Sequence, residues 1–460
     1  MQTNNTKITR AHFIGVGGIG VSAILRLFAA QGVRVSGSDT YLPPLFTLPT
    51  GDYFDTHSES HITNDIDLIV YSPAISDTNP ERARGKELGI KELSYPEALA
   101  LVTFDHNTIA VSGTHGKSTT TALVGKLFEK GGLDPSVIVG AEVPGWETRN
   151  LRIGKSDIFI VEACEYRRNM LELTPQAIVL TNIELDHPDY YHDLADVKNA
   201  FRTYVQKLRQ EDLLIMNDDD ANIREVVGEF DGIIVRYGIG EGKDLFAQGV
   251  SEGEVGQHFE LVWKGSSLGK FTSVLPGIYN LYNILAAVAT YLSYGGKTTT
   301  IQETLNEFTG VGRRFERIGT LEGATVISDY AHHPTALRAV YNAAKSKYKD
   351  KRILTVFRPH HRERTRKLFD EFVESVREIP EMILVEIYDV PGREEGIPIS
   401  SRDIITKVKE TDSDAPLEYA SDLIEAERMI REHVKNFDVI IVIGAGDADT
   451  LAKKLVEATV

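Results

Sequence analysis

The chain has 460 residues, of which 42% are hydrophobic and 25% are charged, and its formal net charge is −17. This length predicts two or three domains, and the composition is typical of an ordinary globular protein. The acidic balance argues against general nucleic-acid binding and against attraction to anionic membrane surfaces.

The single cysteine, Cys164, excludes an internal disulfide and a cysteine-based metal site, and it fits a reducing cytoplasm. The N-terminal stretch MQTNNTKITR is polar and lacks the apolar region of a signal peptide. No run approaches the roughly 18 apolar residues of a membrane helix. We therefore expect a cytoplasmic protein without a membrane segment, either a monomer or a weak homodimer.

Residues 1–106 alternate short apolar strands with helices, which predicts a small α/β unit with parallel strands. The first strand runs into HFIGVGGIG, where Gly15, Gly17 and Gly20 have the G-x-G-x-x-G spacing. Asp39 stands at the end of the next strand, in VRVSGSD. This pattern is typical of a loop that holds a diphosphate at a helix N-terminus, with an acid for a ribose.

The sequence pattern does not determine which ligand this first loop binds. Both NAD and a nucleotide sugar are compatible with it, because the glycines only require that the backbone approaches a diphosphate closely. A tight turn without a ligand is the alternative, and Asp39 is equally plausible as a solvent-facing loop acid.

Residues 107–313 begin with a second glycine-rich loop, GTHGKST, between a strand and a helix closed by Gly131 and Gly132. In such loops the lysine, here Lys117, reaches the terminal phosphates, and the hydroxyl of Ser118 can ligate Mg²⁺. The loop is shorter than the usual phosphate-binding motif, whose first glycine would fall on Val111. A nucleotide triphosphate site is nevertheless the favoured interpretation.

Polar residues follow two further strands of this segment: Glu162 in IFIVEACE, and Asn182, Asp186 and His187 in IVLTNIELDH. Ligands of open α/β sheets sit at the carboxyl ends of strands. Carboxylate oxygens suit Mg²⁺, and His187 could add an imidazole. Each acid alone could be a solvated loop residue. Further along, residues 240–270 predict hairpins beside the sheet, and NLYNILAAVATYLSYGG predicts a helix.

Residues 314–460 restart the alternation and predict a third α/β unit. Polar clusters again follow its strands, in SDYAHHPT and in FRPHHRERT. Asn280 and Asn283 stand one turn apart near a helix start, where Asn280 could simply cap the helix, and Arg313 and Arg314 lie in the linker. Each residue could be structural, but the shared position at strand ends predicts one cleft between the second and third domains.

The ordered motifs GxGGxG, GTHGKST, E-A-x-E, TNIExDH, N-x-x-N, RRFE, DYxHHPT, PHxxxRT and GAGD resemble those of the Mur ligase family over essentially the whole chain. The resemblance implies an N-terminal Rossmann-like domain for a UDP-sugar, a central P-loop ATPase-like domain and a C-terminal Rossmann-like domain. It also implies an ATP-dependent, amide-bond-forming ligation. ATP would phosphorylate the lactyl carboxylate of UDP-N-acetylmuramate, and the amine of L-alanine would attack the acyl phosphate. Two loops would then serve two phosphate-bearing substrates.

The resemblance also assigns roles to single residues. Catalysis would use Lys117, Glu162 and His187, and the metal, Mg²⁺, would be held by Ser118, Glu162 and His187. The ATP-binding residues would be Gly113, Thr114, His115, Gly116, Lys117, Ser118, Thr119, Asn280, Asn283, Arg314 and Asp329. The UDP-sugar would contact Gly15, Gly17, Gly18, Ile19, Gly20, Ser22, Asp39, Ser72 and Asn182. The amino acid would contact Tyr330, His332, His360 and Arg364.

Two alternatives remain at this stage. One is the family branch that attaches a whole tripeptide to the same UDP-sugar during murein recycling. The other is an NAD-dependent oxidoreductase built on the first loop, which leaves GTHGKST unexplained.

The chain also departs from the usual family pattern. Tyr279 replaces a histidine, and Tyr166, Arg167 and Arg168 replace small and acidic residues. Several relatives carry a carbamoylated lysine at the position of Phe201. The nearby Lys198 is interpreted as a solvated helix lysine instead.

Overall fold

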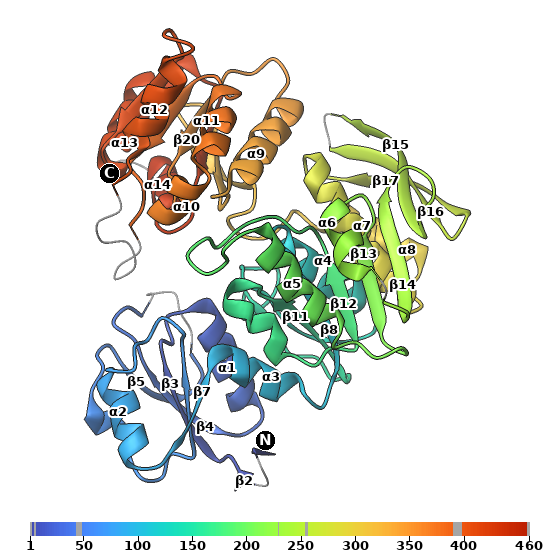
Figure 1. Cartoon of the computed structure of the whole chain (residues 1–460), viewed down its shortest axis with the longest axis vertical. Helices are drawn as coiled ribbons and strands as arrows, with labels where there is room; N and C mark the ends of the chain where they lie inside the picture. Colours follow the sequence, from blue (N-terminus) through green and yellow to red (C-terminus); the bar gives the residue numbers. More distant parts are fainter. Residues whose placement is uncertain are drawn as a thin grey trace.

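This computed structural model describes residues 2–3, 6–42, 48–228, 230–253, 256–389 and 398–457. Consecutive parts of the chain build three sheets with helices around them (Figure 1). A short antiparallel pair, β1 (Gln2–Thr3) and β2 (Thr6–Lys7), precedes them. The α/β class with three sheet-centred domains, predicted from the sequence, is confirmed.

The N-terminal sheet is fully parallel, in the order β5-β4-β3-β6-β7. Its strands are β3 (Arg10–Ile14), β4 (Arg34–Ser38), β5 (Gly51–Phe54), β6 (Leu68–Tyr71) and β7 (Lys91–Ser94). Its helices are α1 (Ile19–Ala30), the short η1 (Glu59–His61), α2 (Pro80–Glu87) and α3 (Tyr95–Thr103). The first strand, β3, lies centrally between β4 and β6, so the glycine loop after it opens at the point where the strand order reverses.

The central sheet has ten strands in the order β10-β9-β11-β8-β12-β13-β14-β15-β16-β17. Its first seven strands in chain order are β8 (Asn107–Ser112), β9 (Ser136–Ile138), β10 (Leu151–Arg152), β11 (Ile158–Ala163), β12 (Ala177–Leu180), β13 (Leu213–Asn217) and β14 (Ile233–Ile239). The hairpins predicted beside this sheet are part of it. Strands β15 (Leu245–Glu252), β16 (Gln257–Trp263) and β17 (Ser266–Ser273) continue it at one edge.

Two helices fix the strand that carries the second loop. The helices of this part are α4 (Lys117–Lys130), η2 (Tyr166–Glu172), α5 (Leu194–Val205), α6 (Ala221–Val227), α7 (Ile278–Ser293) and α8 (Thr298–Glu307). Ile109 and Val111 of β8, Leu123 of α4 and Leu285 of α7 are fully buried in one apolar cluster. This packing holds the carboxyl end of β8 and the start of α4 in a rigid frame.

The C-terminal sheet has the order β18-β19-β23-β20-β21-β22, with only the β18–β19 pair antiparallel. Its strands are β18 (Glu316–Leu321), β19 (Ala324–Asp329), β20 (Ile353–Phe357), β21 (Met382–Val385), β22 (Leu417–Ala420) and β23 (Val439–Ile443). Its helices are α9 (Pro334–Lys347), α10 (Arg362–Lys367), α11 (Phe369–Arg377), α12 (Ser401–Lys409), α13 (Leu423–His433), η3 (Val434–Asn436) and α14 (Ala448–Val456).

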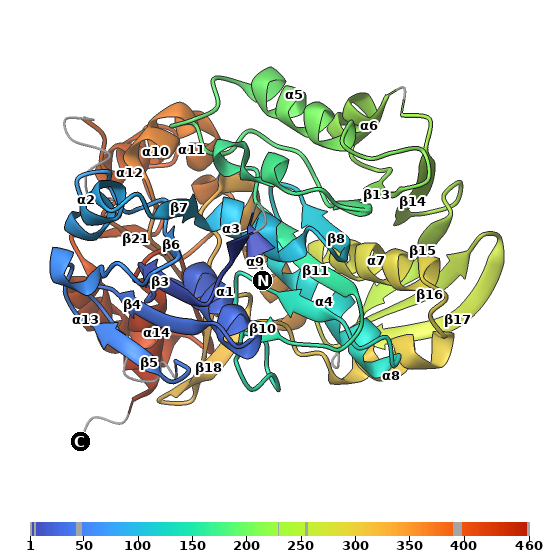
Figure 2. The ribbon, with the colours of Figure 1, turned by 90° about the horizontal axis from the view of Figure 1, so that it is seen from below.

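The segments after β19 and β20 contact the central domain. His333 lies 3.1 Å from the Leu185 carbonyl oxygen, and Arg364 pairs with Asp186. Figure 1 shows the orange-to-red C-terminal part at the top and the blue N-terminal part at the bottom, while Figure 2, seen from below, shows the green and yellow central part extending away to one side of both. Among the described residues, no helix combines the length and apolar character needed to cross a bilayer.

Candidate active site

The second glycine loop, residues 113–116, joins β8 to α4 in a conformation that requires glycine. Gly113 has a φ of +141° and Gly116 a φ of +83°. A Cβ on Gly113 would lie 2.0 Å from the Thr181 hydroxyl oxygen, and one on Gly116 would lie 2.2 Å from Asn283 Oδ1. The loop backbone therefore sits tightly against β12 and α7, with the free N–H groups of α4 at its mouth, an arrangement suited to phosphate.

Lys117 begins α4 and is held by the loop that precedes it. Its Nζ donates to the Gly113 carbonyl at 2.6 Å and the Thr114 carbonyl at 3.0 Å, and lies 2.8 Å from Glu165 Oε2. Burial acts to lower the pKa of Lys117, but the negative Glu165 outweighs it and raises the pKa above the usual value. The ammonium is therefore charged. Glu165 was not among the candidate residues, although it ends the E-A-x-E motif.

Ser118 and Glu162 form a pair of oxygen groups next to Lys117. Glu162 is the last residue but one of β11, and its Oε1 accepts the Gly140 N–H at 2.6 Å. Burial raises the pKa of Glu162, while the nearby Ser118 hydroxyl acts to lower it. A carboxylate and a hydroxyl that share one buried edge, beside a phosphate-binding loop, are a donor set that fits Mg²⁺.

His187 contacts Glu165, the same carboxylate that pairs with Lys117. Its backbone has a positive φ of 52°, its Nε2 is 3.4 Å from Glu165 Oε1, and its ring lies 4.6 Å from that of Tyr166. The structure therefore brings Ser118 and Glu162 into contact and links His187 to them only through Glu165 and Lys117.

A pocket of 380 Å³ opens beside the second loop, between the central and C-terminal domains. From the predicted ATP set it is lined by His115, Gly116, Ser118, Thr119, Asn283, Arg314 and Asp329. Thr114 is engaged in the loop itself, since its hydroxyl donates to the Glu184 carbonyl at 3.2 Å and accepts the Glu184 N–H at 2.9 Å.

The two predicted asparagines of α7 have different positions. Asn283 reaches the pocket, whereas Asn280 donates to the Pro276 carbonyl at 2.8 Å and accepts from Asn283 Nδ2 at 3.2 Å. The helix starts after Gly277, so Asn280 is not its cap. Asn280 thus orients Asn283 and does not line the pocket.

The position of Asn182 differs from the sequence-based expectation. It was grouped with the UDP-sugar residues, but it lines the 380 Å³ pocket. Its Oδ1 accepts the His115 N–H at 2.7 Å and its Nδ2 donates to the His115 carbonyl at 3.0 Å. Asn182 therefore braces the second loop, because the end of β12 lies next to the end of β8 in the sheet.

Asp329 and Arg314 form the C-terminal wall of the pocket. The Asp329 carboxylate accepts the N–H groups of Phe315 and Ala331, each at 2.7 Å, which ties the linker to the end of β19. Burial raises the pKa of Asp329 even though Arg314 acts to lower it. Arg314 also lies over the ring of Tyr330, 4.9 Å from its centre.

The predicted amino-acid residues gather around Asp186. Arg364 Nε donates to Asp186 Oδ1 at 2.8 Å, and His332 Nε2 lies 3.7 Å from Asp186 Oδ2. Burial opposes ionisation of Asp186, but the positive Arg364 holds its pKa well below the usual value. Arg364 also donates to the His360 carbonyl at 3.0 Å, and the His332 and Tyr330 rings lie 5.4 Å apart.

The histidines of this group are neutral at pH 7. Burial, followed by the positive Arg364, lowers the pKa of His332 to about 4. Burial, followed by His332 and Arg364, lowers the pKa of His360 to about 3. They can therefore accept a hydrogen bond from an ammonium group.

The first glycine loop is held by acceptors that take up its N–H groups. The Gly15 N–H donates to the Ser38 carbonyl at 2.8 Å, and the Gly17 N–H donates to Asp39 Oδ2, also at 2.8 Å. A Cβ on Gly17 would lie 2.4 Å from the Tyr41 carbonyl oxygen, and one on Gly15 would lie 2.8 Å from the Ser72 Cβ. Asp39 therefore fixes the loop instead of projecting away from it.

Accessibility to a ligand differs among three further residues of the first loop and of α1, Gly18, Ile19 and Ser22. Gly18 and the 39% exposed Ile19 lie at the loop mouth, where α1 begins. Ser22 is fully buried, and its hydroxyl donates to the Ile19 carbonyl at 3.1 Å. We therefore remove Ser22 from the predicted UDP-sugar set.

Tyr95 packs against the first loop. A Cβ on Gly20 would lie 2.9 Å from the Tyr95 ring. Burial, followed by the negative Glu162 and Cys164, raises the pKa of Tyr95. The N-terminus of α1 thus faces the end of β11, although no sequence pattern singled out Tyr95. Burial also raises the pKa of the Cys164 thiol to about 12, so it is unreactive.

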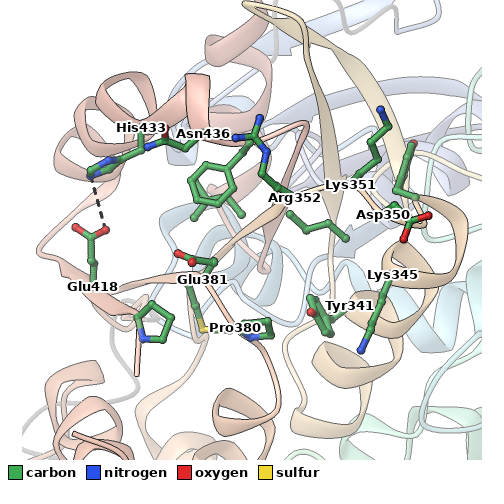
Figure 3. A pocket seen from close by; sticks show the side chains of 16 residues that line it. Tyr341, Lys345, Asp350, Lys351, Arg352, Pro380, Glu381, Glu418, His433 and Asn436 are labelled. Carbon is green, nitrogen blue, oxygen red and sulfur yellow. Dashed lines mark ion pairs between the residues drawn. The ribbon is translucent and has the colours of Figure 1, made fainter. Parts of the chain in front are cut away.

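A wider cavity of 680 Å³ lies at the opposite edge of the C-terminal sheet (Figure 3). Its residues Arg352, Glu381 and Glu418 stand where β20, β21 and β22 begin, and Figure 3 marks the 3.7 Å pair of His433 and Glu418. Ligands of such sheets bind at the carboxyl ends of strands. The 380 Å³ pocket, at those ends, is therefore the candidate active site.

Three family models match parts of the three domains. The Mur ligase middle domain matches residues 111–291, the glutamate ligase domain of Mur ligases matches 313–446, and the Mur ligase family catalytic domain matches 10–45.

Relatives match over nearly the whole length. UDP-N-acetylmuramate–L-alanine ligase of Alkaliphilus metalliredigens is 36% identical, over 98% of this chain and 97% of its own. The enzyme of the same name from Caldanaerobacter subterraneus is 34% identical, over 99% of both chains. The crystal structure of the UDP-N-acetylmuramate-alanine ligase of Thermotoga maritima has a TM-score of 0.80 at 25% identity, covering 97% of this chain and 98% of its own. A murein peptide ligase from Psychrobacter arcticus has a TM-score of 0.71 at 21% identity, covering 97% and 98%, and shares the fold.

Proposed function

This chain belongs to the Mur ligase family, and we infer that it joins L-alanine to the lactyl carboxylate of UDP-N-acetylmuramate, with ATP hydrolysed to ADP and phosphate, in peptidoglycan precursor synthesis. The observation that carries this inference is the pair of glycine loops, one in each of two domains, each at the start of a helix. One diphosphate ligand would need only one of them.

The reaction has two steps. A carboxylate oxygen of the sugar attacks the γ-phosphorus of ATP, and the bond to the β-phosphate oxygen breaks, giving an acyl phosphate and ADP. The amine nitrogen of L-alanine then attacks the acyl carbon, phosphate leaves, and the nitrogen loses a proton. Phosphorylation is needed because a free carboxylate has no good leaving group.

The residues of the second loop fit the first step. The loop N–H groups and the charged Lys117, which lies at the start of α4 beside Glu165, would neutralise the transferring phosphoryl group. Asn283, Arg314 and Asp329 line the pocket where the rest of ATP would bind. Arg314 lies in the linker and Asp329 ends β19 of the C-terminal domain, whereas Lys117 and Ser118 belong to the central domain. Closure of the two domains about the linker would therefore bring these groups around ATP.

Ser118 and Glu162 would hold Mg²⁺, whose positive charge offsets the negative charge of the phosphates. Glu165 keeps Lys117 charged and in place, and His187 contacts Glu165. In the second step, neutral His332 and His360 would accept a hydrogen bond from the incoming ammonium group, beside Arg364.

Phosphate release tests the proposal. With ATP, Mg²⁺ and UDP-N-acetylmuramate present, sustained release of phosphate should require L-alanine. The tripeptide L-alanyl-γ-D-glutamyl-meso-diaminopimelate should not replace it. Turnover with the tripeptide but not with L-alanine would assign the chain to the recycling branch, and binding of NADH in place of the UDP-sugar would overturn the assignment of the first loop.

A further inference from the structure

Three potential metal ligands from both sides of the domain boundary meet at the rim of the nucleotide pocket. His115 belongs to the second loop, Glu184 follows β12, and His333 precedes α9 in the C-terminal domain. Nε2 of His115 lies 3.2 Å and Nδ1 of His333 lies 3.6 Å from the same oxygen, Glu184 Oε2. All three ligand atoms lie within 4.8 Å of one another.

The central domain holds its two ligands firmly. The backbone of His115 is clamped by Asn182 at both its N–H and its carbonyl. The backbone of Glu184 is tied to the Thr114 hydroxyl in the same way. The two side chains therefore stand on a preformed frame, and binding an ion there would cost little ordering entropy.

The ring of His333 is oriented for ligation. It is buried, and its Nε2 lies 3.1 Å from the Leu185 carbonyl oxygen, which can only accept a hydrogen bond. That contact places the proton on Nε2. Nδ1 accepts the Thr335 N–H at 3.3 Å and lies 3.6 Å from Glu184, so a bound ion would replace this long hydrogen bond. Burial, followed by His115, lowers the pKa of His333 to about 4, so the ring is neutral at pH 7.

We propose that His115, Glu184 and His333 bind a transition-metal dication such as Zn²⁺, in a site that bridges the central and C-terminal domains. Zn²⁺ with bonds of about 2.1 Å separates its ligand atoms by roughly 3.4 Å in a tetrahedron. The distances of 3.2 and 3.6 Å match this spacing. Water or a phosphate oxygen would complete the coordination.

This site differs in chemistry from the Mg²⁺ site at Ser118 and Glu162. Two imidazole nitrogens and one carboxylate favour Zn²⁺ or Co²⁺, whereas Mg²⁺ prefers oxygen ligands. His115 and Glu184 also line the 380 Å³ pocket, so an ion there would alter nucleotide binding. Because His333 comes from the other domain, the ion would also hold the two domains together.

The test is a titration of Zn²⁺, and of Co²⁺ as a coloured probe, into the full-length chain without nucleotide or Mg²⁺. We expect His333→Ala to lower the number of tightly bound ions by one, with affinity at that site falling about 100-fold or more. His115→Ala should have the same effect on the number of bound ions. If thermal melting shows that His333→Ala is not folded, His115→Ala serves as the test variant. The matched control is His433→Ala, which removes another histidine that faces a glutamate, at 3.7 Å, in the wider cavity.

The count of bound ions matters because other histidines, such as those around Glu81, could bind the probe as well. The control should keep the full count. A site variant that binds as many ions as the wild type, with the same affinity, would overturn the proposal, as would a wild type that binds none. Since the measurement uses the ligand-free chain, either result leaves the assignment of the ligase reaction untouched.

Discussion

The two loops are both rich in glycine and both join a strand to a helix, but they are stabilised by different groups. The first loop is held by acceptors, the Ser38 carbonyl and the Asp39 carboxylate, which take up loop N–H groups. The second loop is followed by a charged lysine that lies between its own carbonyls and Glu165, next to Ser118 and Glu162.

The difference indicates a division of labour. A loop fixed by acceptors can bind and orient a diphosphate that stays intact. A loop with a charged lysine and two nearby carboxylates can hold charge that shifts during phosphoryl transfer. Glycine spacing alone therefore predicts phosphate binding, and the neighbouring charges determine whether chemistry follows.

The largest expected effect is that of Lys117→Ala, which removes the cation that distinguishes the second loop. We expect turnover to fall by about 10²–10³, or roughly 3–4 kcal/mol of transition-state stabilisation, while the fold is retained. The measurement is kcat with saturating ATP. Lys126→Ala, on the same helix and paired with Glu129 at 3.6 Å, is the control and should keep normal turnover. More than half of wild-type kcat in Lys117→Ala would contradict the role.

The next effect concerns the support of the first loop. Fully buried Glu81 accepts a hydrogen bond from Ser38 at 2.5 Å and lies 2.7 Å from His61 Nδ1 and 3.1 Å from His57 Nδ1. Burial opposes its ionisation, but His12, Ser38 and His61 lower the pKa of Glu81 from 4.5 to about 2. Because the pKa of Glu81 is lower in the folded chain than its usual value of 4.5, its ionised carboxylate stabilises the fold above pH 4.5. This stabilisation is lost as the pH falls toward 2, where the carboxylate becomes protonated in the folded chain.

Glu81→Gln should remove that dependence. The difference in unfolding free energy between wild type and variant should shrink by roughly 3 kcal/mol between pH 5 and pH 2. Urea unfolding at a series of pH values measures it, with Glu59→Gln, on the exposed η1 helix nearby, as the control. Parallel pH profiles for wild type and Glu81→Gln would show that the cluster does not stabilise the folded chain.

Gly17→Val tests whether the first loop serves the UDP-sugar alone. The added side chain would collide with the Tyr41 carbonyl and with Asp39, a strain of about 1–3 kcal/mol that would displace the loop from the diphosphate. We expect a higher KM for UDP-N-acetylmuramate and an unchanged KM for ATP. Gly18→Ala is the milder comparison, since its Cβ would meet only the Gly15 carbonyl, at 3.3 Å. A parallel rise in both KM values would mean that the two loops are not independent.

The smallest expected effect is that of Lys198→Ala. Lys198 lies on α5, and its Nζ pairs with Glu225 at 2.6 Å. The sequence suggested a solvated lysine, whereas the structure shows an ion-paired one. Surface pairs contribute about 0–1 kcal/mol. We expect most of the activity to remain and the intact mass of the wild type to show no carbamoyl group. A mass increase on Lys198, with activity of the variant restored by short carboxylates, would contradict this.

The sequence predicted the fold class and both loops because glycine spacing and buried strands are local signals. It did not predict Glu165, Tyr95 or the bracing role of Asn182, because their partners are brought close only by neighbouring strands or another domain. The resemblance implied that Ser22 contacts the UDP-sugar, and its hydroxyl bonds within the helix. Asp186 was noted after its strand, yet its partner Arg364 is 178 residues away.

The central claim is that each loop holds its own phosphate-bearing substrate. Calorimetric titration of UDP-N-acetylmuramate and of a non-hydrolysable ATP analogue into the wild type, Gly17→Val and Lys117→Ala tests it most directly. The account predicts that the wild type binds both ligands, that Gly17→Val loses affinity for the UDP-sugar only, and that Lys117→Ala loses affinity for the ATP analogue only. Loss of both ligands in either correctly folded variant, or competition between the two ligands for one site in the wild type, would contradict it.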